Sequence, residues 1–276
     1  MVEDFENSRE VFVPELPEVE TARRRAEKYI RGRRIVGVYA ARDPIVFQGV
    51  SRRKFAAGLG GRKILAVKRR GKHIWLELDK RPWPSFHFGM TGRFGFYRKQ
   101  SERPKYCKLE LGLSGGRRFA MRNVRRLGRI RLLEDPEHSQ PISELGFDAL
   151  LDELEVEEIG GILGGRKAAI KAVLLDQSVF AGVGNWIADE VLYQAGLDPH
   201  RPACKLKREE VAKICQCLRR IVGKAVAVEA DYRRFPRRWL FHYRWDKNSG
   251  ATVGGERIEF DVVGGRTTAW VPGRQR

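Results

Sequence analysis

The stretch VPELPEVETARRRAEKYIRG occupies residues 13–32 of this 276-residue chain. It predicts a helix over residues 15–31, because apolar residues recur there at helical spacing; they are Val19, Ala22, Ala26, Tyr29 and Ile30. Gly32 suits the C-terminal end of this helix. Glu15 and Glu18 lie three residues apart, on one side of the helix. Taken alone, these residues are also what an ordinary helix N-terminus contains, because Pro is common in the first turn and acidic side chains are favoured near the positive end of the helix dipole.

Beyond this helix the pattern changes to that of strands. Between residues 34 and 134, short runs alternate apolar and polar residues with a period of two, and Gly, Pro or Ser separates them. This pattern is typical of a β-sandwich or barrel. Helical spacing then returns over four segments, 144–153, 167–176, 185–195 and 207–228. Short strand-like runs follow after residue 239.

We therefore predict an α+β fold with five segments. An acidic extension occupies 1–13, a helix with a β-sandwich domain 14–135, a linker 136–143, a helical domain 144–238, and a β-hairpin segment 239–276. The first twelve residues carry four acidic side chains and one basic one, and they have neither the basic flank nor the apolar run of a secretory signal. We expect a disordered tail or an upstream extension of the gene model.

Composition excludes several classes of protein. The net charge is +19, and a surplus of this size is usually matched by a polyanion. No apolar run approaches the roughly 20 residues that a membrane helix needs. The four cysteines do not have the spacing of a disulfide scaffold, so a reducing compartment is the simpler interpretation.

Two arginine-rich segments stand out from this basic background. Residues 117–131 contain seven Arg and no acid, and residues 231–244 contain five Arg interleaved with aromatic residues. A charge run is usually a solvated face, but Arg alternating with aromatics suits contacts to phosphates and bases better. The two segments together favour nucleic-acid binding.

Three further motifs allow both a structural and a functional interpretation. GVGNW at 182–186 predicts a tight turn before a helix that starts near Asn185, where backbone N–H groups suit a phosphate; an ordinary Asn cap is the alternative. GGRTTAWVP at 264–272 predicts a hairpin with Arg266 at its tip, either a phosphate clamp or a surface charge. Lys72, in RRGKHIW at 69–75, lies at a turn between two strands.

In this order and at these spacings, the motifs resemble the formamidopyrimidine-DNA glycosylase family, and its plant and fungal branch in particular. The resemblance extends from about Pro14 to Pro272, and it includes FHFGMTG at 86–92, VRRLGRIRLL at 124–133 and WIADEVLYQAG at 186–196. It implies a β-sandwich domain, a helix–two-turn–helix domain and a C-terminal finger. The implied activity is removal of oxidised purines, such as 8-oxoguanine and formamidopyrimidines, followed by cleavage of the strand.

The resemblance also implies a role for each matching residue. Pro14 is the nucleophile, because a secondary amine can attack C1′ of the damaged nucleotide, expel the base and form an iminium. Glu15 is the general acid and base at the sugar, and Glu18 supports the active site. Lys72 contacts phosphate and lesion. The iminium permits β,δ-elimination, which nicks the strand without a metal or a nucleotide cofactor.

Further residues are implied to contact DNA. The DNA-binding residues are Lys171, Asn185 and Arg266. Extrusion of the damaged base leaves a gap in the stack, which the family fills with three side chains, here Met90, Arg126 and Leu127. The implied partner is double-stranded DNA with an oxidised base or an abasic site, bound by a monomer. The compartment is the nucleus for a plant or fungal protein and otherwise the cytoplasm or nucleoid; a secreted or membrane protein is not expected.

Three features depart from the family pattern. Residues 239–276 contain no Cys, where bacterial members carry four, so we expect a finger without zinc in which packing replaces the metal. Leu127 stands where Phe is usual, and Asn123 where Asp is usual. Pro14 follows Val13, and an acylated proline nitrogen is an amide without a usable lone pair. The chain as written should therefore not form the iminium.

Three hypotheses follow. The first is an active glycosylase and lyase from which residues 1–13 are absent or removed. The second is a non-catalytic protein that binds damaged or abasic DNA. The third, a ribosomal or other RNA-binding protein that shares only the helix–two-turn–helix element, leaves PELPEVE, GMTG and GGRTTAWVP unexplained.

The absence of Cys after residue 217 generates a first prediction. Elemental analysis of the dialysed protein should find no stoichiometric zinc, because His242 has no cysteine partner in the finger segment. About one zinc per chain would contradict this prediction.

Overall fold

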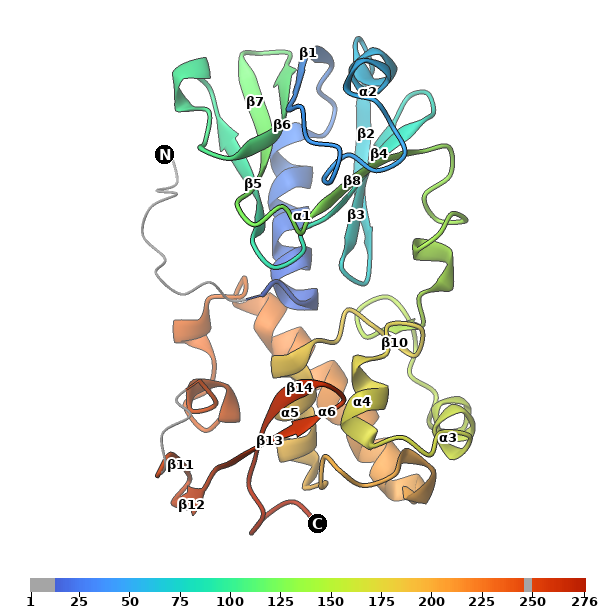
Figure 1. The fold of residues 1–276 in the computed structure, drawn as a ribbon, viewed down its shortest axis with the longest axis vertical. Coiled ribbons are helices and arrows are strands. Elements are labelled where there is room, and N and C mark those ends of the chain that lie inside the picture. Colours follow the sequence, from blue (N-terminus) through green and yellow to red (C-terminus); the bar gives the residue numbers. More distant parts are fainter. Residues whose placement is uncertain (1–12, 246–249) are drawn as a thin grey trace. The chain divides into compact units, whose positions relative to one another are not determined.

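The structure is a computed structural model of the chain and describes residues 13–245 and 250–276. The predicted acidic extension therefore lies outside the described residues, except for Val13. The chain divides into two compact units. Pro14 and Glu18–Glu144 belong to the first unit, and Glu15–Pro17 with Leu145–Arg276 form the second. The ribbon of each unit is shown in Figure 1.

The first unit contains helix α1 (Leu16–Ile30) and two antiparallel four-stranded sheets. One sheet has the order β1 (Ile35–Ala40), β6 (Cys107–Leu113), β7 (Arg117–Asn123), β5 (Gly92–Tyr97). The other has the order β2 (Ile64–Arg70), β3 (His73–Leu78), β4 (Trp83–His87), β8 (Arg129–Leu133). The predicted helix and strands are thus confirmed. Gly32, with φ of 76°, adopts the left-handed conformation that ends the helix.

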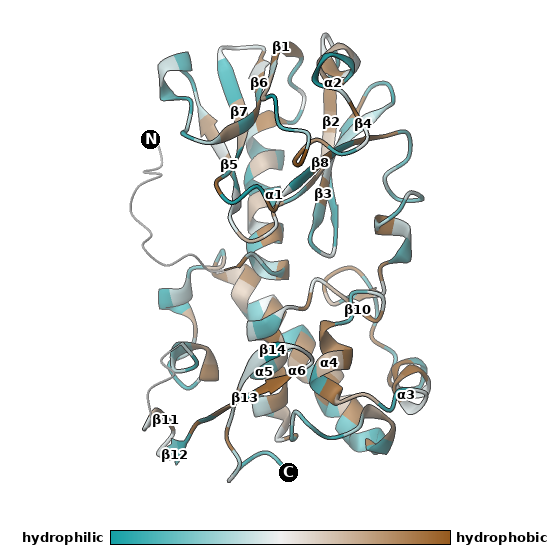
Figure 2. Cartoon of the chain, viewed as in Figure 1, coloured by the Kyte–Doolittle hydropathy of each residue, from teal (hydrophilic) through white to brown (hydrophobic). Residues whose placement is uncertain are grey.

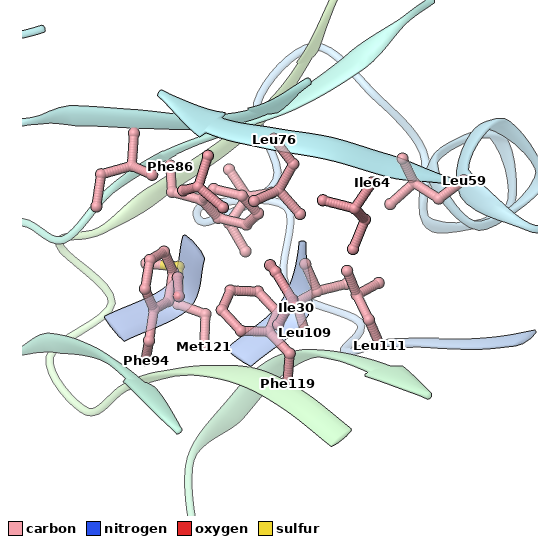
Figure 3. Packing of buried hydrophobic residues seen from close by; sticks show 14 of the residues in the cluster. Ile30, Leu59, Ile64, Leu76, Phe86, Phe94, Leu109, Leu111, Phe119 and Met121 are labelled. Atoms are coloured by element: carbon pink, nitrogen blue, oxygen red, sulfur yellow. The ribbon is translucent and has the colours of Figure 1, made fainter. Parts of the chain in front are cut away.

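The apolar residues of both sheets form one core, in which side chains of β2, β3 and β4 face those of β5, β6 and β7 (Figure 3). Aromatic rings fill its centre. The ring centroids of Phe94 and Phe119 are 4.7 Å apart, and those of Phe86 and Phe94 are 5.4 Å apart. The period-two pattern of the sequence places these residues on the inner faces.

Helix α2 (Arg52–Leu59) was not predicted from the sequence. Its cap is ordinary, because the Ser51 hydroxyl accepts a hydrogen bond from Lys54 N. Only two residues of the helix, Phe55 and Leu59, are buried. A single pair at i and i+4 is too short a repeat to be read as a helix from the sequence.

The second unit is mainly helical. It contains α3 (Val156–Gly164), α4 (Ile170–Leu175), α5 (Asn185–Ala195) and α6 (Arg208–Ala227). The predictions for 185–195 and 207–228 are confirmed, and α4 covers the centre of the predicted 167–176 segment. Hydrophilic and hydrophobic residues alternate along α6 (Figure 2). Cys215 and Cys217 are both buried on this helix as free thiols.

The predicted helix at 144–153 is wrong. This segment contains the end of the 3₁₀ turn η2 (Ile142–Glu144), the short strand β9 (Phe147–Asp148) and turns. Side chains satisfy its backbone, because Asp148 Oδ1 accepts from Leu150 N and Asp152 Oδ2 accepts from Asp148 N. β9 pairs in parallel with β10 (Phe180–Ala181). Helix α3, which follows, was missed because its three glycines lower its helix propensity.

The C-terminal segment forms two hairpins, β11 (Thr252–Val253) with β12 (Glu256–Arg257), and β13 (Glu259–Val263) with β14 (Arg266–Trp270). Gly264 and Gly265 connect β13 to β14 with φ of 61° and 71°, which is the conformation of a two-residue hairpin turn. The predicted tip is therefore confirmed, and Arg266 directly follows it. The α+β class is confirmed as well. Within the described residues, no helix is long and apolar enough to span a membrane.

Candidate active site

Glu15 is fixed by the first turn of α5. Its Oε1 accepts a hydrogen bond from Trp186 N at 2.9 Å, and its Oε2 accepts one from Ile187 N at 3.2 Å. Only 3% of the residue is exposed. Both donors are N–H groups that a helix start leaves without intrahelical partners, and the positive end of the helix dipole favours a carboxylate there. These two N–H groups, which the sequence suggested for a phosphate, are therefore occupied by Glu15.

Two glycines make this approach possible. A Cβ on Gly184 would lie 2.2 Å from Glu15 Cδ, and a Cβ on Gly182 would lie 2.7 Å from Leu16 Cδ1. Gly182 O also accepts a hydrogen bond from Leu16 N. The GVG motif is thus required because the chain around Glu15 packs directly against its backbone.

A buried ionic network lies deeper in the second unit. Asp189 Oδ1 is 2.6 Å from Lys171 Nζ, and its Oδ2 accepts from Arg244 Nη2 at 2.7 Å and from Ala269 N at 3.1 Å. Lys171 and Asp189 are both almost completely inaccessible to solvent. Burial lowers the pKa of Lys171, and the carboxylate of Asp189 opposes this shift. Three elements, α4, α5 and β14, are joined by this single carboxylate.

The same network holds the residue after Arg266. Lys171 Nζ donates to Thr267 O at 2.9 Å, and Asn185 Nδ2 donates to the same oxygen at 2.8 Å. Lys171 and Asn185 therefore meet at the Thr267 carbonyl, which directly follows Arg266 in the chain. Arg266 itself is exposed, and its guanidinium has no hydrogen-bond or ion-pair partner within residues 13–245 and 250–276.

Lys171 differs from its expected role. No part of its side chain is exposed, and its ammonium group is surrounded by Asp189, Thr267 and Thr268. The phosphate contact expected of Lys171 stays a prediction; in this structure the same ammonium group binds internal acceptors. Lys167, four residues earlier, is exposed, and its side chain contacts no partner among the described residues.

In the first unit, Lys72 occupies the two-residue turn between β2 and β3. The preceding Arg69 is buried; its Nε donates to Glu20 Oε2 at 2.9 Å and its Nη1 to Gly71 O at 3.0 Å. Burial opposes ionisation of Glu20, but hydrogen bonds from Arg23, Arg69 and Arg24 outweigh it and lower the Glu20 pKa to about 2. A buried ion pair to α1 thus fixes the turn that carries Lys72.

Two histidines flank this turn as neutral groups. His73 and His87 are cross-strand neighbours with ring centroids 4.7 Å apart. Burial lowers the pKa of His73 to about 3 and that of His87 to about 4, and the charge of Lys72 contributes to both shifts. Near neutral pH the two histidines are therefore uncharged, and the charge of Lys72 opposes their protonation.

The loop residues Met90 and Leu127 come from two loops in direct contact. A Cβ on Gly89 would lie 2.5 Å from Leu127 C and O, and Gly89 has a φ of 62°. Met90 is half-buried, and Leu127 is 41% exposed. The loop that carries Met90 thus packs at Gly89 against the backbone of Leu127, within the first unit.

Arg126 has a different environment. Its Nε and Nη2 donate to the two carboxylate oxygens of Asp43 at 3.0 and 3.1 Å. Burial opposes ionisation of Asp43, yet hydrogen bonds from Arg126 and Lys108 lower its pKa to about 2. Arg125 is exposed, and its guanidinium has no partner among the described residues. Arg126 is thus held by a bidentate ion pair while Arg125 is not, and the gap-filling role expected of Arg126 stays a prediction.

Comparison with protein families accounts for nearly the whole chain. The model of the formamidopyrimidine-DNA glycosylase N-terminal domain matches residues 13–130. The H2TH domain of that enzyme matches 145–236, and the formamidopyrimidine-DNA glycosylase-like C-terminal domain matches 239–272.

The chain belongs to the formamidopyrimidine-DNA glycosylase family.

Curated relatives support this membership. The formamidopyrimidine-DNA glycosylase of Arabidopsis thaliana is 41% identical over 277 residues, covering 96% of this chain and 71% of the relative. That of Desulfitobacterium hafniense is 36% identical over 218 residues, covering 78% of this chain and 79% of the relative. The N-terminal sheets, the helical domain and the C-terminal hairpin of this chain follow one another in the order of the three matched family domains.

Solved structures have the same fold. The enzyme of Lactococcus lactis, non-covalently bound to DNA that contains an AP site, aligns with a TM-score of 0.83 and 24% identity, over 95% of this chain and 99% of that chain. A MutM structure in complex with DNA containing carbocyclic 8-oxo-G aligns with a TM-score of 0.85 and 25% identity, over 95% and 100%.

Several residues that support the candidate active site were not predicted from the sequence. Asp189, Glu20 and Arg69 join distant segments, and none stands in a motif that reveals its partner. The aromatic residues of 231–244 were expected to contact nucleic acid, but Phe235, Trp239 and Phe241 are buried and pack around Trp186. In this segment Arg233, Arg234, Arg237 and Arg238 face solvent, whereas Arg244 is buried against Asp189. The alternation of aromatic residues with arginines in this segment therefore indicates one buried aromatic face and one exposed basic face.

Gly184→Ala tests the support of Glu15. The new methyl group displaces the Glu15 carboxylate, which leaves two buried N–H groups unsatisfied, so we expect a loss of about 1–3 kcal/mol in the free energy of unfolding. Urea denaturation measures this change. Gly160→Ala is the matched control, because its Cβ meets no atom within 4 Å and alanine favours the α3 helix. Equal unfolding free energies for Gly184→Ala and the unchanged protein would contradict the assignment.

Proposed function

We propose that this chain is a bifunctional DNA glycosylase and AP lyase that removes oxidised purines from double-stranded DNA in base excision repair. The observation that carries the proposal is the Glu15 carboxylate, buried and aimed by α5, immediately after Pro14. Family membership supports it, as do related structures bound to DNA with an AP site and with an 8-oxo-G analogue. A protein that only binds RNA has no need of this carboxylate.

The proposed chemistry begins at Pro14. Its secondary amine attacks C1′ of the damaged nucleotide as the bond between C1′ and the base breaks. The attack leaves a proton on the nitrogen and the departing base takes a proton from water. The Glu15 carboxylate accepts the proton from the nitrogen and passes it to the sugar ring oxygen as the ring opens and the iminium forms. The iminium acidifies the neighbouring carbon, and β,δ-elimination releases both flanking phosphates. Water finally releases the sugar fragment and the free amine.

This mechanism requires a free amine at Pro14. In the 276-residue chain the nitrogen is acylated by Val13, so its lone pair is delocalised into the amide. We therefore propose that the active form starts at Pro14. The alternative is a homologue that binds damaged or abasic DNA without catalysis. The presence of Pro14, Glu15 and Gly184, which makes room for Glu15, favours the enzyme.

The DNA contacts are assigned by exposure and charge. Lys72 and Arg266 contact backbone phosphates, and Asn185 supports the second contact through Thr267. Lys167 takes the role first expected of Lys171, whose ammonium group is internal. The residues proposed to fill the gap left by the extruded base are Met90, Arg125 and Leu127. Glu18, half-buried in the first turn of α1, supports the start of that helix.

The remaining predictions are kept as parts of this proposal. Domains extend over 14–135, 144–238 and 239–276, joined by the linker 136–143. The protein acts as a monomer and uses neither a metal nor a nucleotide cofactor. In a plant or fungal cell the substrate places it in the nucleus.

Covalent trapping distinguishes the enzyme from the binding protein. A form produced as Met-Pro14 and processed to a free Pro14 should be trapped by borohydride on abasic-site DNA, because reduction fixes the iminium. The full 276-residue chain, verified by intact mass, should bind the same DNA and trap at least tenfold less. Equal trapping by the two forms would show that another amine, with Lys72 the first candidate, is the nucleophile.

The salt dependence of DNA binding separates surface from buried cations. Arg266→Ala should lower the slope of log K against log salt by about 0.9, because one phosphate contact is lost. Lys171→Met should leave this slope unchanged and instead destabilise the fold, since it removes one of the two buried cations that balance the Asp189 carboxylate and leaves Oδ1 without its partner. A lowered slope for Lys171→Met, with unchanged stability, would restore the phosphate role of that residue.

A further inference from the structure

Asn123 links the two loops that carry Met90 and Leu127. It is the last residue of β7, and no part of it is exposed. Its Nδ2 donates to Phe88 O at 3.0 Å, and its Oδ1 accepts from Gly128 N at 3.0 Å. Both partners are backbone groups of fixed polarity, so the orientation of the side-chain amide is determined.

Each of these bonds closes one loop. Phe88 O also accepts from Gly92 N at 2.9 Å, so this carbonyl ends the turn 88–92, which has Met90 at its centre. Gly128 N ends the loop 123–128, which contains Arg125 and Leu127. One amide therefore sets the position of both loops at once.

The backbone packs tightly around the Asn123 amide and leaves little room for the loops to rearrange. A Cβ on Gly128 would lie 2.9 Å from Asn123 Nδ2, and one on Gly92 would lie 2.5 Å from Phe88 O. The loops also touch directly at Gly89 and Leu127. Because the backbones are this close, loss of the amide bridge cannot be compensated by a small side-chain movement.

We propose that Asn123 is a positioning residue that holds Met90 and Leu127 in the arrangement that enters the gap in duplex DNA. This inference rests on the proposed function. The bridge needs a donor and an acceptor on one side chain. A side chain that lacks these groups leaves both Phe88 O and Gly128 N without the partner that Asn123 supplies.

Asn123→Ala, which removes both hydrogen bonds, and Asn123→Ser, whose side chain is too short to span both partners, test the proposal in the form with a free Pro14. We expect trapping on duplex abasic-site DNA to fall about tenfold or more, the equivalent of one buried hydrogen bond with its partner left unsatisfied. Trapping on the same strand in single-stranded form should change less than twofold, because no gap has to be filled. The discrimination between bases opposite the abasic site should weaken in parallel.

Gln100→Ala is the matched control. It removes a side-chain amide from an exposed residue of the same unit, and it should leave trapping on both substrates unaffected. If Asn123→Ala does not fold, as judged by circular dichroism, the result for Asn123→Ser tests the proposal. Equal losses on duplex and single strand, or no loss on either, would overturn the positioning role. Absence of trapping by the unsubstituted protein on both substrates would instead refute the proposed function.

Discussion

The carboxylate of Asp189 is the interaction on which the second unit depends. It is buried together with Lys171 and Arg244, and it also accepts from the backbone of β14. An isolated charge at this depth would cost several kcal/mol, so each partner requires the others. The consequence is a rigid connection from α5 to the strand that presents Arg266. A member of this family without cysteines in its finger thus has a buried ionic attachment at the base of the hairpin.

Helix α5 positions functional residues both through its N-terminus and through its polar side chains. Its N-terminus binds the Glu15 carboxylate, and its side chains Asn185 and Asp189 hold Thr267 and Ala269. Nine of its eleven residues are buried, so the helix cannot shift without disturbing the core. The proposed acid–base group and the exposed arginine are therefore both positioned from one helix. In the first unit, the Glu20–Arg69 pair and the Asn123 amide have the equivalent function for Lys72 and for the Met90 and Leu127 loops.

Sequence patterns were sufficient for the regular elements and insufficient for the contacts among them. Strands with period two and the long stripes of α1 and α6 were predicted closely, because one buried face determines each pattern. The prediction of a helix at 144–153 was wrong, since the side chains of Asp148 and Asp152 accept hydrogen bonds from backbone N–H groups of the same segment and stabilise turns instead. Lys171 and Arg126 were placed on DNA because a sequence shows a charge without its ion-pair partner; the partners Asp189 and Asp43 are 18 and 83 residues away.

The central claim is that Pro14 is the nucleophile and Glu15 its acid–base partner. Peptide mapping by mass spectrometry of the borohydride-reduced complex, after nuclease and protease digestion, tests it most directly. The account predicts that the sugar fragment is attached to the nitrogen of Pro14, in a peptide that begins at that residue. Attachment to a lysine, Lys72 or Lys167 included, would contradict it.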